Sequence, residues 1–295
     1  MKAIVFGGSG FLGSHVADAL TEAGYNVKIF DLKPSPYLKT EQEMVVGDIL
    51  NFEEVLEAID GCDYVYNFAG IADLDDATTK PIETVRLNIE GTINILEACR
   101  RTAIKRFIYA STIYVYSDKG GFYRCSKQAS ELYIEEFHIR YGLNFTILRY
   151  GTLYGPRADK RNSIYRYLLQ ALNDKNIIAT ADGEELREYI HVGDAARLTV
   201  KILEPEFKNR YLIITGHHPI KLKQLFSTIK EILSDYSIDV SYQHVTNLNH
   251  YSITPYSYIP KIGKKLTTNC YTDIGQGLLE CIHEIDAEKF SAINI

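Results

Sequence analysis

Lys2-Ala-Ile-Val-Phe6 is a short apolar run, and Gly7-Gly-Ser-Gly-Phe-Leu-Gly13 follows it directly. The run predicts a strand at residues 2–6, and residues 11–23 have the apolar spacing of a helix. Three glycines in GxxGxxG spacing therefore lie between a strand and a helix. Glycines permit a tight turn there and let backbone N–H groups at the helix N-terminus approach a pyrophosphate. The stretch predicts a dinucleotide site; the alternative is a glycine-rich turn without a ligand.

Strand-like and helix-like segments continue to alternate through the first half of the chain. Further strands are expected at 26–30, 44–47, 64–69, 106–111 and 144–150, and further helices at 52–59, 82–101 and 123–141. Repeated strand–helix units with apolar strands indicate a parallel sheet covered on both faces. The expected fold class is α/β, with a doubly wound parallel sheet and a smaller C-terminal region.

The regularity weakens after Gly155-Pro156. Helices are expected at 163–173, 222–233 and 273–285, a strand that becomes a helix at 189–203, and a strand at 211–215 that could return to the main sheet. We therefore expect a dinucleotide-binding domain at 1–160, to which 189–216 returns, and a substrate-binding region at 161–188 and 217–295. Tyr251, Tyr256 and Tyr258 of that region could stack on a base or a sugar, although packing is the commoner role.

Composition excludes several classes of function. The chain has 295 residues and a net charge of −6, so it lacks the basic character of nucleic-acid-binding proteins. Its five cysteines are widely spaced without a CxxC pair, which indicates neither a zinc site nor a disulfide framework and fits a reducing cytoplasm. No apolar run is long enough to span a membrane, and glycines interrupt the apolar N-terminus, so we expect neither a membrane anchor nor a signal peptide.

Asp31 ends the second expected strand, close to the glycine turn in a parallel sheet. A carboxylate there can accept hydrogen bonds from the adenosine ribose hydroxyls and would repel a 2′-phosphate, which favours NAD over NADP. The alternative is an ordinary strand-end Asp that faces solvent, and nearby Lys33 weakens the preference. The residues expected to contact the cofactor are Gly7, Gly10, Phe11, Leu12, Gly13, Asp31, Asp48, Ile49, Phe68, Ala69, Gly70, Asn88, Tyr123 and Lys127.

Tyr123 and Lys127 form a YxxxK motif at the start of an expected helix. A spacing of four places both side chains on one helix face. A free Tyr has a pKa of about 10 and is a poor base at neutral pH. We expect the Lys cation and the positive nicotinamide ring to lower that pKa, so that Tyr123 can remove a hydroxyl proton as hydride leaves the same carbon. With 22 tyrosines in the chain, a chance YxxxK is the alternative.

Two hydroxyls and an amide extend this set. Ser111 and Thr112 end the fifth expected strand, and ligands bind beyond the carboxyl ends of parallel strands. Thr112 or Ser111 can therefore hydrogen-bond the substrate oxygen and Tyr123, although either could be a simple cap. Asn88 lies inside a helix, where Asn is unfavourable, and is a candidate fourth member; a backbone-bonded Asn is the alternative.

These residues together resemble the extended short-chain dehydrogenase/reductases of the NAD-dependent epimerase/dehydratase family, which includes UDP-glucose 4-epimerase. The resemblance covers most of the chain. It rests on Gly7–Gly13, Asn88-Ile-Glu-Gly-Thr-Ile-Asn-Ile-Leu-Glu-Ala98, Tyr123–Lys127, Leu148-Arg-Tyr-Gly-Thr-Leu-Tyr-Gly-Pro-Arg157 and Arg187-Glu-Tyr-Ile-His-Val192. It implies a Rossmann domain that binds NAD.

The resemblance also implies a nucleotide-sugar substrate that NAD⁺ oxidises at C4, with Tyr123 as the base and Thr112 beside the substrate. It implies that Arg187 contacts the substrate pyrophosphate, which suits a guanidinium; the alternative is a surface Arg paired with a neighbouring Glu. Relatives are commonly homodimers built on two helices, here those that contain Asn88 and Lys127.

Three departures from the family pattern bear on the substrate. The 4,6-dehydratases follow the catalytic Thr with Asp-Glu, whereas this chain has Ile113-Tyr114, which argues against dehydration and against the related decarboxylases. Relatives often carry Phe-Asn where this chain has Gly151-Thr152, so Thr152 takes the position of an Asn that holds the sugar nucleotide. The segment 117–122 is shorter than in most relatives and could leave a roomier pocket for the sugar.

The first hypothesis is therefore an NAD-dependent nucleotide-sugar epimerase acting at C4. The alternative is a nucleotide-sugar 4-dehydrogenase or ketoreductase of the same fold, which releases the oxidised or reduced sugar. A non-catalytic dinucleotide-binding protein would be expected to lose Tyr123 or Lys127, and both are present. The sequence does not identify the nucleobase or the sugar.

Overall fold

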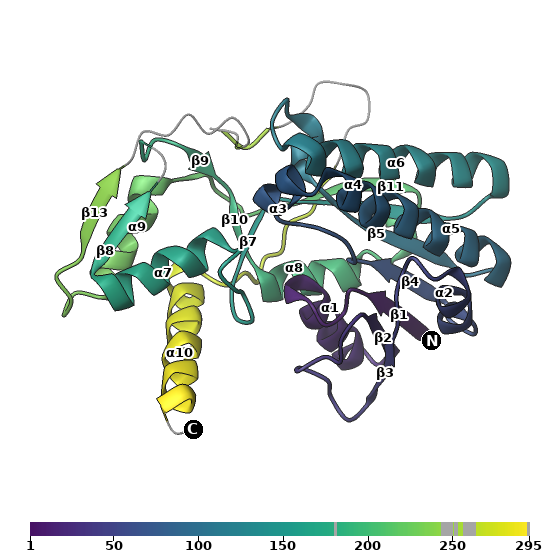
Figure 1. Ribbon diagram of the computed structural model, residues 1–295, viewed down its shortest axis with the longest axis horizontal. Coiled ribbons are helices and arrows are strands. Elements are labelled where there is room, and N and C mark those ends of the chain that lie inside the picture. The colour runs from purple at the N-terminus through teal and green to yellow at the C-terminus, as the bar shows by residue number, and fades with distance from the viewer. Residues whose placement is uncertain (180–181, 243–249, 251–252, 256–263, 294–295) are drawn as a thin grey trace. The chain divides into compact units, whose positions relative to one another are not determined.

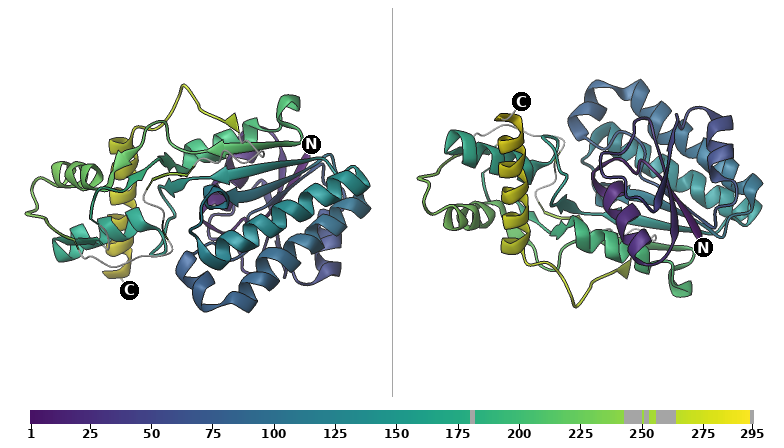
Figure 2. Two further views of the ribbon diagram at one scale, coloured as in Figure 1. Left: turned by 90° about the horizontal axis from the view of Figure 1, so that it is seen from above. Right: turned by 90° about the horizontal axis from the view of Figure 1, so that it is seen from below.

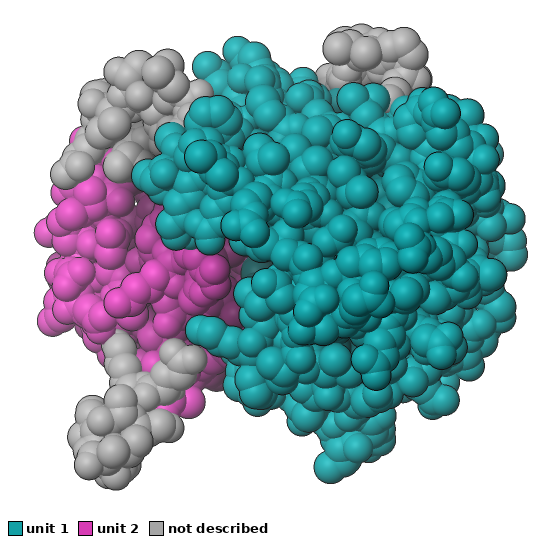
Figure 3. All heavy atoms as spheres, turned by 45° about the vertical axis from the view of Figure 1, so that its right-hand side comes forward, with its two compact units in different colours: residues 1–150, 196–214, 256–266 teal, residues 151–195, 215–255, 267–295 magenta. Residues whose placement is uncertain are grey.

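The computed structural model describes residues 1–179, 182–242, 250, 253–255 and 264–293 (Figure 1). The chain divides into two compact units, which Figure 3 distinguishes by colour. Unit 1 comprises residues 1–150, 196–214 and 256–266, and unit 2 comprises 151–195, 215–255 and 267–295. Each unit has its own hydrophobic core.

Among the residues that the structure describes, unit 1 is built on an eight-stranded sheet in which every neighbouring pair is parallel. In spatial order the strands are β14 (Lys264–Lys265), β11 (Arg210–Ile214), β6 (Phe145–Tyr150), β5 (Arg106–Thr112), β4 (Tyr64–Asn67), β1 (Lys2–Phe6), β2 (Asn26–Asp31) and β3 (Gln42–Val46). The chain runs outward in one direction from β1 to β3 and in the other from β4 to β6. Ligands of such doubly wound sheets bind where this direction reverses, beyond the carboxyl ends of β1 and β4. The predicted fold class is confirmed.

Helices cover both faces of this sheet. They are α1 (Phe11–Glu22), α2 (Phe52–Ile59), α3 (Leu74–Thr79), α4 (Pro81–Thr84), α5 (Gly91–Thr102), α6 (Gly121–Tyr141) and most of α8 (Val192–Lys201). Figure 2 shows α5 and α6 together on one face, and α1 and α8 on the other. β6 is buried along its whole length, which explains why the strands are nearly continuous apolar runs in the sequence.

The helix expected at 82–101 is interrupted in the structure. Pro81 begins the short helix α4, a π-helical turn η1 (Val85–Glu90) follows, and α5 begins only at Gly91. Apolar spacing does not distinguish a π turn from an α turn, so the sequence predicted one helix. Helix α3 was not predicted, although Asp73 is a recognisable N-cap whose carboxylate accepts the N–H groups of Asp75 and Asp76.

In its described residues, unit 2 combines three helices with three small two-stranded sheets. The helices are α7 (Ser163–Asp174), α9 (Leu222–Ile232) and α10 (Ile274–Ile293), and the strand pairs are β7 (Thr152–Tyr154) with β10 (Tyr189–His191), β8 (Asn176–Ala179) with β13 (Asp239–Tyr242), and β9 (Leu186–Arg187) with β12 (Ile220–Lys221). Leu168, Phe226 and Leu278 are among the residues of its core. None of the helices in the described ranges is both long enough and apolar enough to cross a membrane.

The compact units differ at their edges from the expected division of the chain. The first stretch of unit 1 ends at Tyr150 rather than at residue 160, and the segments assigned to it further along the chain are 196–214, rather than 189–216, and 256–266. The reason is that β7 and β10 pair with each other and not with the main sheet, whereas β11 lies beside β6. Which ligand each unit binds stays a prediction.

Candidate functional site

The turn after β1 is packed so closely that it requires glycine. Gly7 has φ +74°, and a Cβ there would lie 2.6 Å from the backbone nitrogen of Ala69 in the segment after β4. A Cβ at Gly13 would lie 2.2 Å from the carbonyl oxygen of Gly7. The start of α1 therefore packs directly against the turn. Its N-cap residue is Gly10, which has no side chain to bond the free N–H groups of the first helical turn. These N–H groups suit an anionic group such as a pyrophosphate.

Asp31 is fixed beside this turn. The backbone N–H of Ser9 donates a hydrogen bond to Asp31 Oδ2 at 3.0 Å, and the Ser9 hydroxyl donates to the carbonyl of Lys33 at 3.0 Å. The carboxylate is half-buried at the end of β2, next to β1. This geometry fits the expected role at a ribose hydroxyl.

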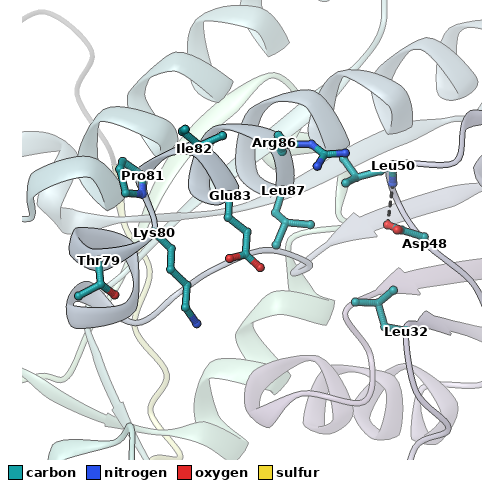
Figure 4. A pocket seen from close by; sticks show the side chains of 10 residues that line it. All are labelled: Leu32, Asp48, Leu50, Thr79, Lys80, Pro81, Ile82, Glu83, Arg86 and Leu87. Carbon is teal, nitrogen blue, oxygen red and sulfur yellow. Dashed lines mark hydrogen bonds between the residues drawn. The ribbon is translucent and has the colours of Figure 1, made fainter.

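A cavity of about 630 Å³ lies between the strand ends and the helical segment α3–η1 of unit 1. Figure 4 shows Leu32 and Asp48 on the strand side, and Lys80, Glu83 and Arg86 on the helical side. A carboxylate oxygen of Asp48 accepts the N–H of Leu50 at 2.9 Å, which fixes the loop after β3. A cavity of this volume accommodates a small organic group such as one half of a dinucleotide.

The expected cofactor contact Ile49 is buried rather than exposed to this cavity. Its side chain fills the space beside Gly91, where a Cβ would lie 2.5 Å from Ile49 Cδ1, and its carbonyl accepts a hydrogen bond from Asn94 at 3.0 Å. Of the expected pair, Asp48 lines the cavity and Ile49 packs beneath it.

Asn88 connects the segment after β4 to α6. Its side-chain oxygen accepts the N–H of Ile71 at 2.7 Å, and its amide nitrogen donates to the Ile71 carbonyl and to the Ser126 hydroxyl, both at 2.9 Å. Gly70 leaves room for this contact, because a Cβ there would lie 2.3 Å from Asn88 Oδ1. The amide is fully engaged with the protein, so its bonds favour an indirect role, in which Asn88 holds the segment Phe68–Ile71 in place.

Thr112, Tyr123 and Lys127 lie together at the carboxyl end of β5. The Lys127 ammonium lies 5.8 Å from the centre of the Tyr123 ring and donates a hydrogen bond to the carbonyl of Ala110 at 2.7 Å. Thr112 lies close enough to Tyr123 to lower the pKa of its hydroxyl. The structure therefore brings together the three residue types that a proton-transferring Tyr needs, as the sequence predicted.

The acid–base properties of this cluster differ from the expectation. Burial of the hydroxyl raises the pKa of Tyr123 to about 12, although the Thr112 hydrogen bond lowers it. Burial lowers the pKa of Lys127 to about 8, against the opposing effect of the Glu131 carboxylate. We expected Lys127 to lower the pKa of Tyr123, but desolvation dominates among the protein's own groups.

The geometry favours Thr112 over Ser111 as the hydroxyl beside Tyr123. The Ser111 hydroxyl donates to Glu131 Oε1 at 2.5 Å, and Ser111 is buried. Arg149 pairs with the same carboxylate at 2.6 Å. Sequence reasoning missed Glu131 and Arg149, although Glu131 follows Lys127 by one helical turn and Arg149 lies inside a quoted motif.

The two expected substrate contacts of unit 2 lie on short strands, Thr152 on β7 and Arg187 on β9, and both are half-buried. Three carboxylates are the alternative partners of Arg187: those of Glu184, Glu185 and Glu188. Glu184 pairs with Lys221 and Lys223, and Glu188 accepts the Thr215 hydroxyl at 2.6 Å, whereas Glu185 remains a possible partner. Tyr251, Tyr256 and Tyr258 lie outside the described residues.

Position 151 has no space for the Phe that relatives often carry. A Cβ on Gly151 would lie 2.6 Å from the methyl group of Thr215, whose hydroxyl is tied to Glu188. Thr215 is almost fully buried, so it cannot move aside freely. The exchange of Phe-Asn for Gly-Thr is therefore matched by the packing of unit 2.

Comparison with known proteins gives a consistent result. The family model "NAD dependent epimerase/dehydratase family" matches residues 3–213. A putative UDP-glucose 4-epimerase from Methanocaldococcus jannaschii is 29% identical over 77% of this chain and 81% of its own length. A UDP-N-acetyl-alpha-D-glucosaminuronate decarboxylase from Bacillus cytotoxicus is 27% identical over 78% of this chain and 80% of its own.

Among solved structures, the chain is similar to a mutant of UDP-glucuronic acid 4-epimerase from Bacillus cereus in complex with UDP-4-deoxy-4-fluoro-glucuronic acid and NAD. The two share 25% identity and a TM-score of 0.86, over 98% of this chain and 100% of the other. The similarity therefore extends through both compact units.

The bond between Ser9 and Asp31 allows a conservative test of cofactor choice. Asp31→Asn keeps an oxygen that can accept the Ser9 N–H but removes the negative charge. We expect the preference for NAD over NADP, measured as the ratio of dissociation constants by calorimetry, to fall at least about tenfold, because a like-charge contact costs several kcal/mol. Asp48→Asn, which also lies at the cavity, is the matched control. An unchanged ratio in Asp31→Asn would contradict the assigned role of this carboxylate.

Proposed function

The chain belongs to the NAD dependent epimerase/dehydratase family, and from this premise we propose that it is an NAD-dependent nucleotide-sugar epimerase that oxidises and re-reduces its sugar at C4. The observation that carries the proposal is the cluster of Thr112, Tyr123 and Lys127 at the carboxyl end of β5. The relatives and the solved structure named above act on or bind UDP-sugars, so UDP-sugars are the first substrates to consider.

The chain's own residues divide the work as follows. Gly7, Gly10 and Gly13 let the start of α1 approach the cofactor pyrophosphate, and Asp31 accepts hydrogen bonds from the adenosine ribose. When bound, NAD supplies the hydride acceptor and later the hydride donor. The protein groups alone leave Tyr123 protonated, and a bound nicotinamide cation would supply the positive charge that favours its phenolate.

Tyr123 takes the proton from the sugar C4 hydroxyl as the hydride leaves C4, and returns it when the hydride comes back to the other face. Thr112 orients the reacting oxygen, and the Lys127 ammonium stabilises the negative charge on Tyr123. In unit 2, we propose that Arg187 binds the substrate pyrophosphate and that Thr152 contacts the sugar nucleotide. Sugar and cofactor regain their starting oxidation states, so the net reaction is an inversion.

The residues after Thr112 favour epimerisation over loss of water or carbon dioxide. Ile113 is buried and apolar, and Tyr114 donates its N–H to Thr112 Oγ1 at 3.3 Å. Neither position carries the carboxylate that moves protons in the 4,6-dehydratases or in the related decarboxylases. Without that acid–base group, loss of water or carbon dioxide is disfavoured, and the keto sugar either takes the hydride back or is released.

We also propose a homodimer that forms through the helical layer of α5 and α6. These helices pack against each other, and the η1–α5 segment and α6 contain Asn88 and Lys127 respectively. Large apolar side chains are exposed on α6, among them Phe122, Leu132 and Ile139. Exposed apolar surface of this kind often marks an interface.

The five free cysteines further favour a reducing compartment such as the cytoplasm.

Leu132→Glu tests the dimer. Leu132 is 55% exposed on α6, and a charge there would have to be buried in the interface. We expect analytical ultracentrifugation to give about twice the chain mass of 33.5 kDa for the wild type and mainly monomer for the variant. Leu38→Glu, at an exposed Leu outside these helices, should leave the dimer unchanged. A monomeric wild type would refute the proposal.

A substrate panel tests the reaction itself. The protein is incubated with NAD⁺ and UDP-, dTDP-, GDP- and CDP-sugars, and products are analysed by mass spectrometry and proton NMR. We expect a product of unchanged mass with a new sugar spectrum. Loss of two hydrogens with accumulation of reduced cofactor would identify a dehydrogenase instead, and inertness toward every sugar nucleotide would reject the substrate class.

Tyr123→Phe tests the base. The variant keeps the ring but loses the hydroxyl that would accept the proton, so we expect turnover to fall by about 10²- to 10⁴-fold while NAD binding is retained. Tyr141→Phe, at the exposed end of the same helix, is the control and should keep full turnover. A Tyr123→Phe protein with wild-type turnover would show that the proton transfer uses another group.

A further inference from the structure

Three consecutive residues of β5, from Ala110 to Thr112, lie against residues of α6 that are one helical turn apart. The carbonyl of Ala110 accepts from Lys127 at 2.7 Å, and the Ser111 hydroxyl donates to Glu131 at 2.5 Å. Thr112, the third of these residues, lies beside Tyr123 and lowers the pKa of its hydroxyl. The carboxylate of Glu131 therefore belongs to the same array as the proposed catalytic residues, although it has no part in the mechanism given above.

Glu131 is held by a buried ion pair with Arg149 of β6. Arg149 donates to both carboxylate oxygens, from Nε at 3.1 Å and from a terminal nitrogen at 2.6 Å, and the two side chains are only 3% and 6% exposed. The other terminal nitrogen of Arg149 donates to the Tyr116 hydroxyl at 2.5 Å. Tyr116 ends the 3₁₀ turn η2 (Ile113–Tyr116), which follows Thr112 directly.

The pair therefore fixes both sides of Thr112. Ser111, on one side, is bonded to Glu131, and η2, on the other, is bonded to Arg149 through Tyr116. A buried ion pair is a weak source of stability, because removing two charges from water costs about as much as their attraction returns. Its place at this strand end therefore calls for a role other than stability.

We propose, on the basis of the function proposed above, that the Glu131–Arg149 pair is a positioning element of the active site, which fixes Thr112 beside Tyr123 and keeps the Lys127 ammonium charged. Glu131 and Arg149 act through their neighbours and touch neither cofactor nor substrate. The proposal makes the carboxylate of Glu131 responsible for the charge state of Lys127 at neutral pH.

The groups around Lys127 support this electrostatic role. From β5, the ring of Tyr109 lies 4.7 Å from the ammonium, and Tyr123 of α6 is the other phenol. The turn η1, which packs against α6, contributes the neutral Asn88. Among the charges of the described residues, the carboxylate of Glu131 raises the pKa of Lys127. Burial lowers that pKa more strongly, to about 8.

The remaining charged and titratable groups of this region surround Glu131. Arg149 contributes the positive charge from β6, with its guanidinium 4.6 Å from the Tyr116 ring and 4.8 Å from the Tyr211 ring of β11. Glu135, one turn further along α6, accepts the Tyr211 hydroxyl. Lys127 is charged below its pKa, so any loss of the Glu131 charge shortens the pH range in which Lys127 is a cation.

The first experiment measures Lys127 directly, in protein without added cofactor or substrate. Protein labelled with ¹³C-lysine is titrated by NMR, and the Cε signal of Lys127 is assigned by its loss in Lys127→Arg. We expect a midpoint near pH 8 in the wild type and a midpoint lower by about one pH unit in Glu131→Gln. Glu136→Gln, which breaks an exposed ion pair with Arg140 on the same helix, should leave the midpoint unchanged.

A second measurement links this shift to turnover. The alkaline limb of the pH profile of kcat should move to lower pH by the same amount in Glu131→Gln and stay in place in Glu136→Gln. Because the NMR titration needs no turnover, it distinguishes failure of this proposal from failure of the proposed function. If the panel of sugar nucleotides gives no product, the Lys127 midpoint still decides whether Glu131 controls its charge.

Glu131→Gln leaves Arg149 buried without its carboxylate and could unfold the protein. The double variant Glu131→Gln/Arg149→Met removes both charges and keeps apolar volume, so it provides a second version of the test. The Lys127 midpoint should be lowered in the double variant as well. The proposal would be overturned if a folded Glu131→Gln or double variant had the same Lys127 titration midpoint as the wild type. It would also be overturned if the midpoint moved in a variant but the alkaline limb of its kcat profile did not.

Discussion

The candidate site depends on the attachment of α6 to the carboxyl end of β5. One face of the helix supplies Tyr123, Lys127 and Glu131, and the strand end meets them with a hydroxyl, a carbonyl and a second hydroxyl. Such bonds in a buried region are stronger than at the surface, and each unsatisfied partner would be costly. The attachment therefore fixes the distance between the phenol and the ammonium more tightly than helix geometry alone could, and the rest of the proposed chemistry relies on that distance.

The cofactor end is governed by a steric constraint of a different kind. The turn after β1 lies against the segment after β4 because the strand order reverses between these two neighbours. At Gly7 and Gly13 any side chain would collide with backbone atoms, so the close approach of turn, strand end and helix start exists only with glycine. Asp31 is held next to the turn by its bond to Ser9, so the residue proposed to select the cofactor is attached to the same loop.

The packing of the structure accounts for two of the departures from the family pattern. Ile113 is buried where dehydratases carry a carboxylate, and Gly151 adjoins a Thr215 methyl group that leaves no room for a larger side chain. Each exchange therefore fits the side-chain packing of the unit in which it occurs. They support a site that returns its hydride to the sugar and that holds the sugar nucleotide with a shorter side chain at position 152.

The sequence by itself determined the parallel sheet and the glycine turn, and it identified Asp31 and the YxxxK pair as candidate site residues. Apolar periodicity, glycine spacing and a spacing of four on a helix are local properties of the chain, so no tertiary contact is needed to recognise them. The sequence could not choose between Ser111 and Thr112, since that depends on which hydroxyl Glu131 occupies. Nor could it show that Ile49 is buried, that η1 interrupts a helix, or that burial raises rather than lowers the pKa of Tyr123. Only the tertiary structure decided these points, because desolvation and hydrogen-bond partners come from residues that are distant in the chain and meet only in the folded protein.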